Sequence, residues 1–146
     1  MRAMLINNPE LAQAILCEVY EQVAEDNAPH PSTLDLTGIP VIALRGDEGV
    51  HGIMMMQPFG FNSTIVGVAI RPDYYGHKEN IELVRRGVAQ CAEITNAPKF
   101  LMAIPTEDKS TLRLAQQVGF KREGVIRNSF LRNGKMIDQY LVGISV

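Results

Sequence analysis

The sequence predicts one α/β domain built on a mixed sheet, and three observations lead to this expectation. The chain has 146 residues, the size of one domain, so residues 1–146 are expected to fold as a single unit. Strand-like and helix-like segments follow in the order strand, helix, three strands, helix, strand, helix, two strands. The segment Phe100–Ile104 is short and wholly apolar, as expected of a strand in a sheet covered on both faces. Hairpins combined with crossover helices build an α/β sandwich.

The N-terminal part is expected to supply a strand, a helix and a loop. Met1–Ile6 is predicted to be a short first strand. Asn8 should cap a helix that opens with Pro9, where a missing N–H costs nothing. Spacing of four residues gives this helix one apolar stripe, formed by Leu11, Ile15, Val19 and Val23. Residues 27–38 hold two prolines and several turn formers, which predicts a loop with room for one helical turn.

The middle of the chain is expected to form three strands and a helix, over residues 40–45, 50–56, 64–71 and 80–95. Gly46–Gly49 should join the first two strands as a hairpin. The helix carries one apolar face, and Asn96-Ala97-Pro98 ends it.

The C-terminal part is expected to form a strand, a short helix and a hairpin, over residues 100–104, 109–118, 120–131 and 135–142. Gly119 should stop the helix. The Asn133-Gly134 pair tolerates positive φ and therefore suits the turn of the hairpin.

Composition narrows the class of protein. Hydrophobic residues make up 46% of the chain and charged residues 21%, an ordinary balance for a soluble protein. Neither a charged-then-apolar leader nor an apolar run approaching about 18 residues is found, so secretion and membrane spanning are not expected. Cys17 and Cys91 lack metal-ligand or redox spacing and are expected to be reduced, buried thiols of a cytoplasmic protein. No spacing suggests a metal site.

Charge is distributed unevenly along the chain. Residues 1–70 carry two basic and eight acidic side chains, whereas residues 71–146 carry twelve basic and eight acidic ones. A polyanion such as coenzyme A would be drawn to the basic half, although a solvated surface with chance asymmetry explains the count as well. Nucleic acid is not an expected partner, because the basic residues are scattered, no stacking aromatics lie between them, and the total charge is acidic.

Two segments have the pattern of a binding or catalytic site. Arg71–Asn80 (RPDYYGHKEN) is predicted to run from a strand through a tight turn into a helix, whose exposed N–H groups and dipole favour phosphate oxygens. The second segment, Asp108–Phe120, is a polar loop with a short helix that ends at Gly119-Phe120. A further series of polar residues and glycines follows this segment, namely Glu123-Gly124, Arg127, Gly134 and Asp138.

These segments resemble the GNAT family of acyl-CoA-dependent N-acyltransferases, and the C-terminal series is similar to its ribosomal-protein N-terminal acetyltransferase branch. The resemblance covers residues 40–146 well and residues 1–39 loosely. It implies the GNAT fold, which is a mixed, mostly antiparallel sheet with helices on both faces. It also implies an active site in the gap between the strand that ends near Arg71 and the strand that begins near Phe100.

The resemblance implies a set of acetyl-CoA contacts, namely Val68, Ala69, Ile70, Tyr75, Gly76, His77, Lys78, Glu79, Asn80, Asp108 and Thr111. The chain departs from the family pattern at five of them, since Asp108 stands for the family's Asn, Thr111 stands for its Ser, and three further departures lie in the turn. Tyr75 stands where the family has Arg or Gln, and Lys78 and Asn80 stand at two glycine positions. Glycine lets a backbone approach a ligand closely, so these departures bear directly on coenzyme A binding. Lys78 and His77 offer polar groups to the phosphates instead.

Two residues are candidates for catalysis. Ala115 stands where many family members carry a Tyr acid, and the ribosomal-protein branch also tends to lack that Tyr. In that branch the Ser hydroxyl is the suggested acid, so the resemblance implies that Thr111, at the Ser position, protonates the leaving thiolate. A hydroxyl in a first helical turn also commonly bonds backbone. Asp108 is similarly open to a helix-capping role. His51 is the candidate base because its ordinary pKa lies near neutrality, and it is expected to share a strand face with Ile53 and Met55. A lone His beside apolar residues is also typical of a packed core.

The sequence therefore predicts a cytoplasmic N-acetyltransferase that moves an acetyl group from acetyl-CoA to a primary amine, which is a protein N-terminus, a lysine or a small amine. The alternative is a GNAT-shaped protein with little catalysis that binds a partner protein. The short length and altered phosphate turn are similar to compact phage members of the family, which would place the protein in a host cytoplasm. A homodimer is compatible with the expected fold. Asp138 and Tyr140 are expected to be structural.

Overall fold

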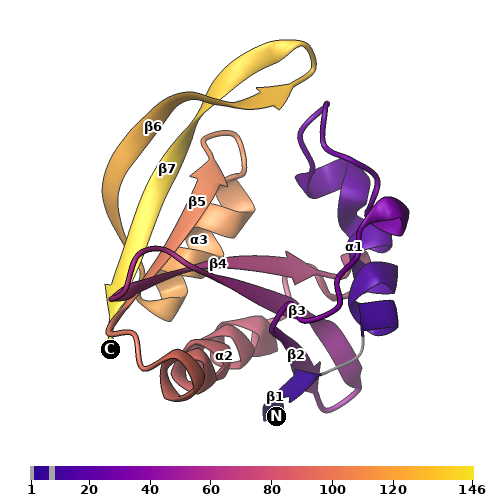
Figure 1. The fold of residues 1–146 in the computed structure, drawn as a ribbon, viewed down its shortest axis with the longest axis vertical. Coiled ribbons are helices and arrows are strands. Elements are labelled where there is room, and N and C mark those ends of the chain that lie inside the picture. Colours follow the sequence, from indigo (N-terminus) through magenta and orange to yellow (C-terminus); the bar gives the residue numbers. More distant parts are fainter. Residues whose placement is uncertain (1, 7–8) are drawn as a thin grey trace.

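A seven-stranded sheet organises the chain in the computed structural model, which describes residues 2–6 and 9–146. The strands stand in the order β1-β2-β3-β4-β5-β7-β6. Their bounds are β1 Arg2–Ile6, β2 Val41–Gly46, β3 Gly49–Pro58, β4 Ser63–Ile70, β5 Lys99–Pro105, β6 Lys121–Arg132 and β7 Lys135–Ser145. Neighbouring strands are antiparallel except β4 and β5, which are parallel. The predicted mixed, mostly antiparallel sheet is therefore confirmed (Figure 1).

The helices follow the predicted pattern. They are α1 Pro9–Val23, α2 Glu79–Thr95 and α3 Lys109–Val118, with 3-10 turns η1 Pro31–Thr33 and η2 Pro72–Tyr74. Left-handed Asn96 ends α2, and Gly119, with φ of 124°, ends α3. The 3-10 turn η1 occupies the predicted loop 27–38. The predicted cap at Asn8 lies outside the described residues.

Two apolar clusters cover opposite faces of the sheet. Alternation along β3 sends Met54 and Met56 into a cluster with α2 and α3, while Ile53 packs in a second cluster with α1. The predicted placement of helices on both faces is confirmed. Cys91 lies in the first cluster, where burial raises the pKa of its thiol to about 12 and keeps it protonated. Cys17 is only half-buried, so its predicted burial is wrong.

The parallel pair β4–β5 is joined over a short length only. Ser63, Thr64 and Ile65 pair with β5, and beyond Ile65 the two strands part. The rest of β4 stays paired with β3, and β5 stays paired with β7 (Figure 1). Because the strands are parallel, the segments that follow their carboxyl ends, η2 with α2 and the start of α3, lie at the same edge of the sheet.

Within the described ranges, no helix is long and apolar enough to cross a membrane. No group of three or more His, Cys, Asp or Glu residues in those ranges could hold a metal ion.

Candidate functional site

The diverging edge of β4 forms one wall of the candidate site. Val68, Ala69 and Ile70 pair with β3 on one side, and within the described chain they have no pairing with β5 on the other. Val68 and Ile70 are partly exposed. Main-chain groups along this edge are therefore available to an extended ligand.

Residues 71–80, called the phosphate turn below, connect β4 to α2. Gly76 has φ of 78°, a left-handed conformation that glycine adopts most easily, and a β-carbon built there would have open space around it. In the described chain, the N–H groups of Gly76, Lys78 and Glu79 make no hydrogen bond, whereas those of His77 and Asn80 bond to carbonyl oxygens within the turn. Three free donors thus gather at the start of α2, where the helix dipole also favours an anion.

In the part of the chain that the structure describes, neither of the two side chains at the family's glycine positions forms a hydrogen bond with these donors. Asn80 is 4% exposed and turns inward, with Oδ1 2.8 Å from His51 Nδ1 and Nδ2 donating to the Tyr74 carbonyl at 2.8 Å. Lys78 is exposed and forms no capping hydrogen bond. The Asn80 side chain is therefore engaged in the interior, and the Lys78 side chain lies in solvent.

The start of α3 brings Asp108 and Thr111 to the same edge of the sheet. Asp108 does not cap the helix, so that prediction is wrong, because its carboxylate instead accepts hydrogen bonds from Arg132 at 2.7 and 3.4 Å. Thr111 is partly exposed, and its hydroxyl makes no hydrogen bond within the described residues. The backbone-bonded interpretation of Thr111 is therefore not observed.

The structure buries His51 against the first turn of α2. His51 is the extra residue of a β-bulge, since Leu44 pairs with Gly52 and Arg45 pairs with Val50. The bulge turns its ring towards the first turn of α2, so the predicted shared face with Ile53 is wrong. The ring has no solvent exposure, and a general base must come within hydrogen-bond reach of the acceptor amine. This position does not provide that access.

The tip of the β6–β7 hairpin is fastened to the segment after α1. The Asp26 carboxylate accepts from the Asn133 and Gly134 amides at 3.0 and 2.8 Å, and Asp26 N–H donates to the Leu131 carbonyl at 2.9 Å. Arg132 joins the hairpin to α3 through Asp108, and this hydrogen bond raises the pKa of its guanidinium. These contacts fix the side of the site opposite β4.

Replacing Arg132 with glutamine should lower the free energy of unfolding by about 2 kcal/mol, because a charged hydrogen-bonded pair at the tip of the hairpin is lost. Urea denaturation measures the change. Arg85→Gln is the matched control, since its ion pair with Glu82 is exposed and should contribute no more than about 0.5 kcal/mol. Equal costs for the two variants would contradict the proposed fastening role.

Asp138 and Tyr140 have structural contacts. Asp138 Oδ1 accepts from the Asn128 amide at 2.9 Å and holds a bulge in β6 where Asn128 has φ of 50°. The Tyr140 ring lies 3.9 Å from the guanidinium carbon of Arg122. Sequence reasoning missed Asp26, Arg132 and the His51–Asn80 pair, because each contact joins residues far apart in the chain and no spacing rule signals it.

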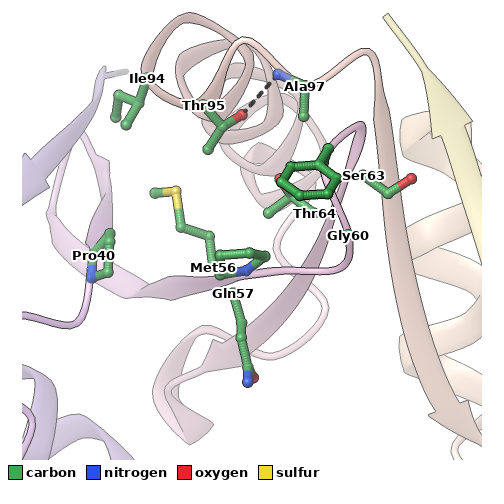
Figure 2. Close-up of a pocket in the computed structure, with 11 residues that line it drawn as sticks. Pro40, Met56, Gln57, Gly60, Ser63, Thr64, Ile94, Thr95 and Ala97 are labelled. Atoms are coloured by element: carbon green, nitrogen blue, oxygen red, sulfur yellow. Dashed lines mark hydrogen bonds between the residues drawn. The ribbon is translucent and has the colours of Figure 1, made fainter.

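A pocket of about 390 Å³ lies at the C-terminal end of α2, where Ile94 and Thr95 line it (Figure 2). The phosphate turn precedes the other end of this helix. Its lining is uncharged and consists of Pro40, Met56, Gln57, Pro58, Gly60, Phe61, Ser63, Thr64, Ile94, Thr95 and Ala97. Phe59 and Phe61 lie in the connection between β3 and β4, and they are 58% and 102% exposed. This pocket is separate from the candidate site.

Comparison with known proteins identifies the fold. No protein-family model matches the sequence, and no curated protein matches it. Among solved structures, a ribosomal-protein-S5-alanine acetyltransferase from Vibrio fischeri is similar, with a TM-score of 0.76 and 15% identity over 98% of this chain and 91% of that one.

Two further solved structures agree with this result. A spermidine N-acetyltransferase from Vibrio cholerae, in complex with CoA and spermine, has a TM-score of 0.74 and 15% identity over 98% of this chain and 95% of that one. A GNAT-family acetyltransferase from Bacillus anthracis has a TM-score of 0.74 and 14% identity over 99% and 95%. The chain thus has the fold of GNAT acetyltransferases, as the sequence predicted.

Proposed function

We propose that this protein transfers an acetyl group from acetyl-CoA to a primary amine. The observation that carries the proposal is the combination of three free N–H groups at Gly76, Lys78 and Glu79 with the unpaired edge of β4. Free amides at a helix start are suited to a diphosphate, and an open strand edge is suited to an extended amide-containing chain such as pantetheine. The same fold occurs in a solved acetyltransferase complex with CoA and spermine.

The chemistry requires few groups from the protein. The amine attacks the thioester carbonyl carbon, a C–N bond forms and the C–S bond breaks. The nitrogen loses one proton to solvent, and the sulfur leaves with a proton, so the numbers of protons balance. Thr111 is the residue we assign to that proton, because its partly exposed hydroxyl has no competing partner in the described chain and lies at the edge where β4 and β5 part. Main-chain N–H groups of the β4 edge are suited to the developing oxyanion.

Titration calorimetry with CoA and with acetyl-CoA tests the proposal directly. Dissociation constants in the micromolar range are expected, followed by release of free thiol when an amine is added. Absence of heat at millimolar ligand would contradict the proposal.

Charge reversal at Lys78 should weaken CoA binding about tenfold, since an exposed cation beside the diphosphate becomes an anion. Calorimetry at low and high salt measures the change, which should shrink at high salt because exposed charges are screened. Lys121→Glu makes the same charge change at the start of β6 and serves as the control. Equal losses in both variants would show a general charge effect instead of a contact at the phosphate turn.

One observation favours the alternative of a partner-binding protein. The uncharged pocket carries the fully exposed Phe61 at its edge and has Ile94 beside it, 42% exposed. Apolar surface of this kind commonly marks an interaction site. The calorimetric experiment separates the two functions, because only the transferase requires CoA binding.

A further inference from the structure

A set of buried side chains connects β3 to the phosphate turn. His51 and Asn80 meet through the 2.8 Å contact between Nδ1 and Oδ1, and Asn80 Nδ2 donates to the Tyr74 carbonyl at 2.8 Å. The His51 ring also stacks on the Tyr74 ring, with centroids 4.0 Å apart and planes 20° apart. Tyr74 and Asn80 flank the three free amides of the turn. Both ends of that segment are therefore held from inside the protein.

The hydrogen bonds can run in one direction only. The Tyr74 carbonyl accepts, so the amide nitrogen of Asn80 must face it and its oxygen must face His51. That oxygen also accepts only, so Nδ1 of His51 carries the hydrogen. The orientation of the Asn80 amide is assigned from the hydrogen-bond network. In this orientation its oxygen and its nitrogen each have one partner.

Burial makes the contact costly to lose. His51 is 0% exposed and Asn80 is 4% exposed, so water cannot readily replace either side chain as a partner. Removing the Asn80 amide leaves the His51 Nδ1–H without an acceptor and removes one hydrogen bond to the Tyr74 carbonyl. Buried polar groups without partners cost more than the hydrogen bond itself contributes.

Gly46 provides the space for the His51 ring. A β-carbon on Gly46 would lie 2.5 Å from His51 Nε2 and 2.8 Å from Glu79 Oε2. The bulge in β3 brings the ring to this space, so features of the neighbouring strands β2 and β3 together serve one contact with α2.

We propose that Asn80 and His51 are positioning residues, which hold the free amides of the phosphate turn in the arrangement that binds the CoA diphosphate; this inference rests on the proposed function. The Asn at a family glycine position is then a compensated change. The Asn80 side chain holds the turn from the interior of the protein. The amides of Gly76, Lys78 and Glu79 remain free to bind the diphosphate.

Asn80→Gly provides a test by the sign of its effect. It restores the family glycine, yet the inference predicts that CoA binding becomes about tenfold weaker. A tenfold change in the dissociation constant corresponds to about 1.4 kcal/mol, which is the size of one lost buried hydrogen bond. Tighter or unchanged binding, measured by calorimetry, overturns the inference. Ala89→Gly, at an exposed position of the same helix, controls for the helix destabilisation that any glycine causes. It should leave the dissociation constant within about twofold.

Variants of His51 provide the second test. His51→Asn keeps an N–H donor for Asn80, whereas His51→Leu does not, so the Asn variant should bind CoA several-fold more tightly than the Leu variant. Combining His51→Leu with Asn80→Gly should weaken binding no further than Asn80→Gly alone, because that change already removes the contact that the two residues share. Additive losses in the double variant overturn the inference.

Amide hydrogen exchange in the free protein separates this inference from the proposed function. Exchange at the hydrogen-bonded amides of Tyr75 and His77, which lie on either side of Gly76, should be faster in Asn80→Gly than in wild type, and unchanged in Ala89→Gly. If wild type binds no CoA, the transferase proposal fails while faster exchange still supports the positioning of the turn. If exchange at these amides is the same in all three proteins, the positioning role is overturned whatever CoA does.

Discussion

Replacing Thr111 with valine should lower kcat for acetyl transfer about 100-fold, while KM for acetyl-CoA changes much less. A positioned general acid contributes roughly 10²–10⁴ in rate, and valine removes the hydroxyl while keeping the shape of the side chain. The Thr111 hydroxyl has no hydrogen bond within the described chain, so its loss leaves no buried partner unsatisfied and the fold should be retained. Release of free thiol, followed at saturating amine, measures the rate.

Thr111→Ser is the control for this prediction. It keeps the hydroxyl at the same position of α3, and its activity should stay within about tenfold of wild type. A valine variant as active as the serine variant would contradict the role assigned to Thr111. A valine variant with unchanged kcat and raised KM would instead place the hydroxyl in substrate binding.

Replacing Gly52 with alanine should destabilise the fold by about 3 kcal/mol, the largest expected effect on stability. A β-carbon on Gly52 would collide with the carbonyl oxygen of Ala69 and lie 3.0 Å from the Ile70 Cα, both of which are backbone atoms that cannot rotate away. Gly52 pairs with Ile70, so β3 and β4 must separate at the wall of the candidate site. Urea denaturation measures the change, and CoA affinity should fall as well.

Gly67→Ala is the matched control for stability. Gly67 lies in the same strand pair, opposite Met55, and a β-carbon there would have no atom within 4 Å. Its free energy of unfolding should change by less than about 1 kcal/mol, because only the entropy of the glycine backbone is altered. Similar losses at Gly52 and Gly67 would show that strand propensity, and not the collision, dominates.

Much of the fold could be predicted because its signals are local. Gly119 ends α3, and the Asn133-Gly134 pair with positive φ at both residues forms the β6–β7 turn, as expected. The order of strands and helices was also predicted, since periodicity and turn residues act within a few neighbours along the chain. Boundaries shifted by one to three residues, as at the start of α2 and the end of β7.

The candidate site was predicted less completely. Gly76 adopts the left-handed turn that its position indicates, and the free amides follow from the helix start. The roles of Asp108 and His51 could not be predicted in the same way. Asp108 has the sequence of a helix cap but pairs with Arg132, 24 residues later, and His51 is turned by a bulge that pairing with β2 creates.

By itself, the sequence determined the elements, their order and the turn that precedes α2, because these depend on backbone preferences and on the spacing of apolar residues. The tertiary structure alone decided where β4 and β5 part, which face His51 occupies and that Asn80 points inward. Those features depend on strand register and on contacts between residues such as His51 and Asn80, 29 positions apart. Such contacts form only after the sheet and α2 have packed together, so no local pattern encodes them.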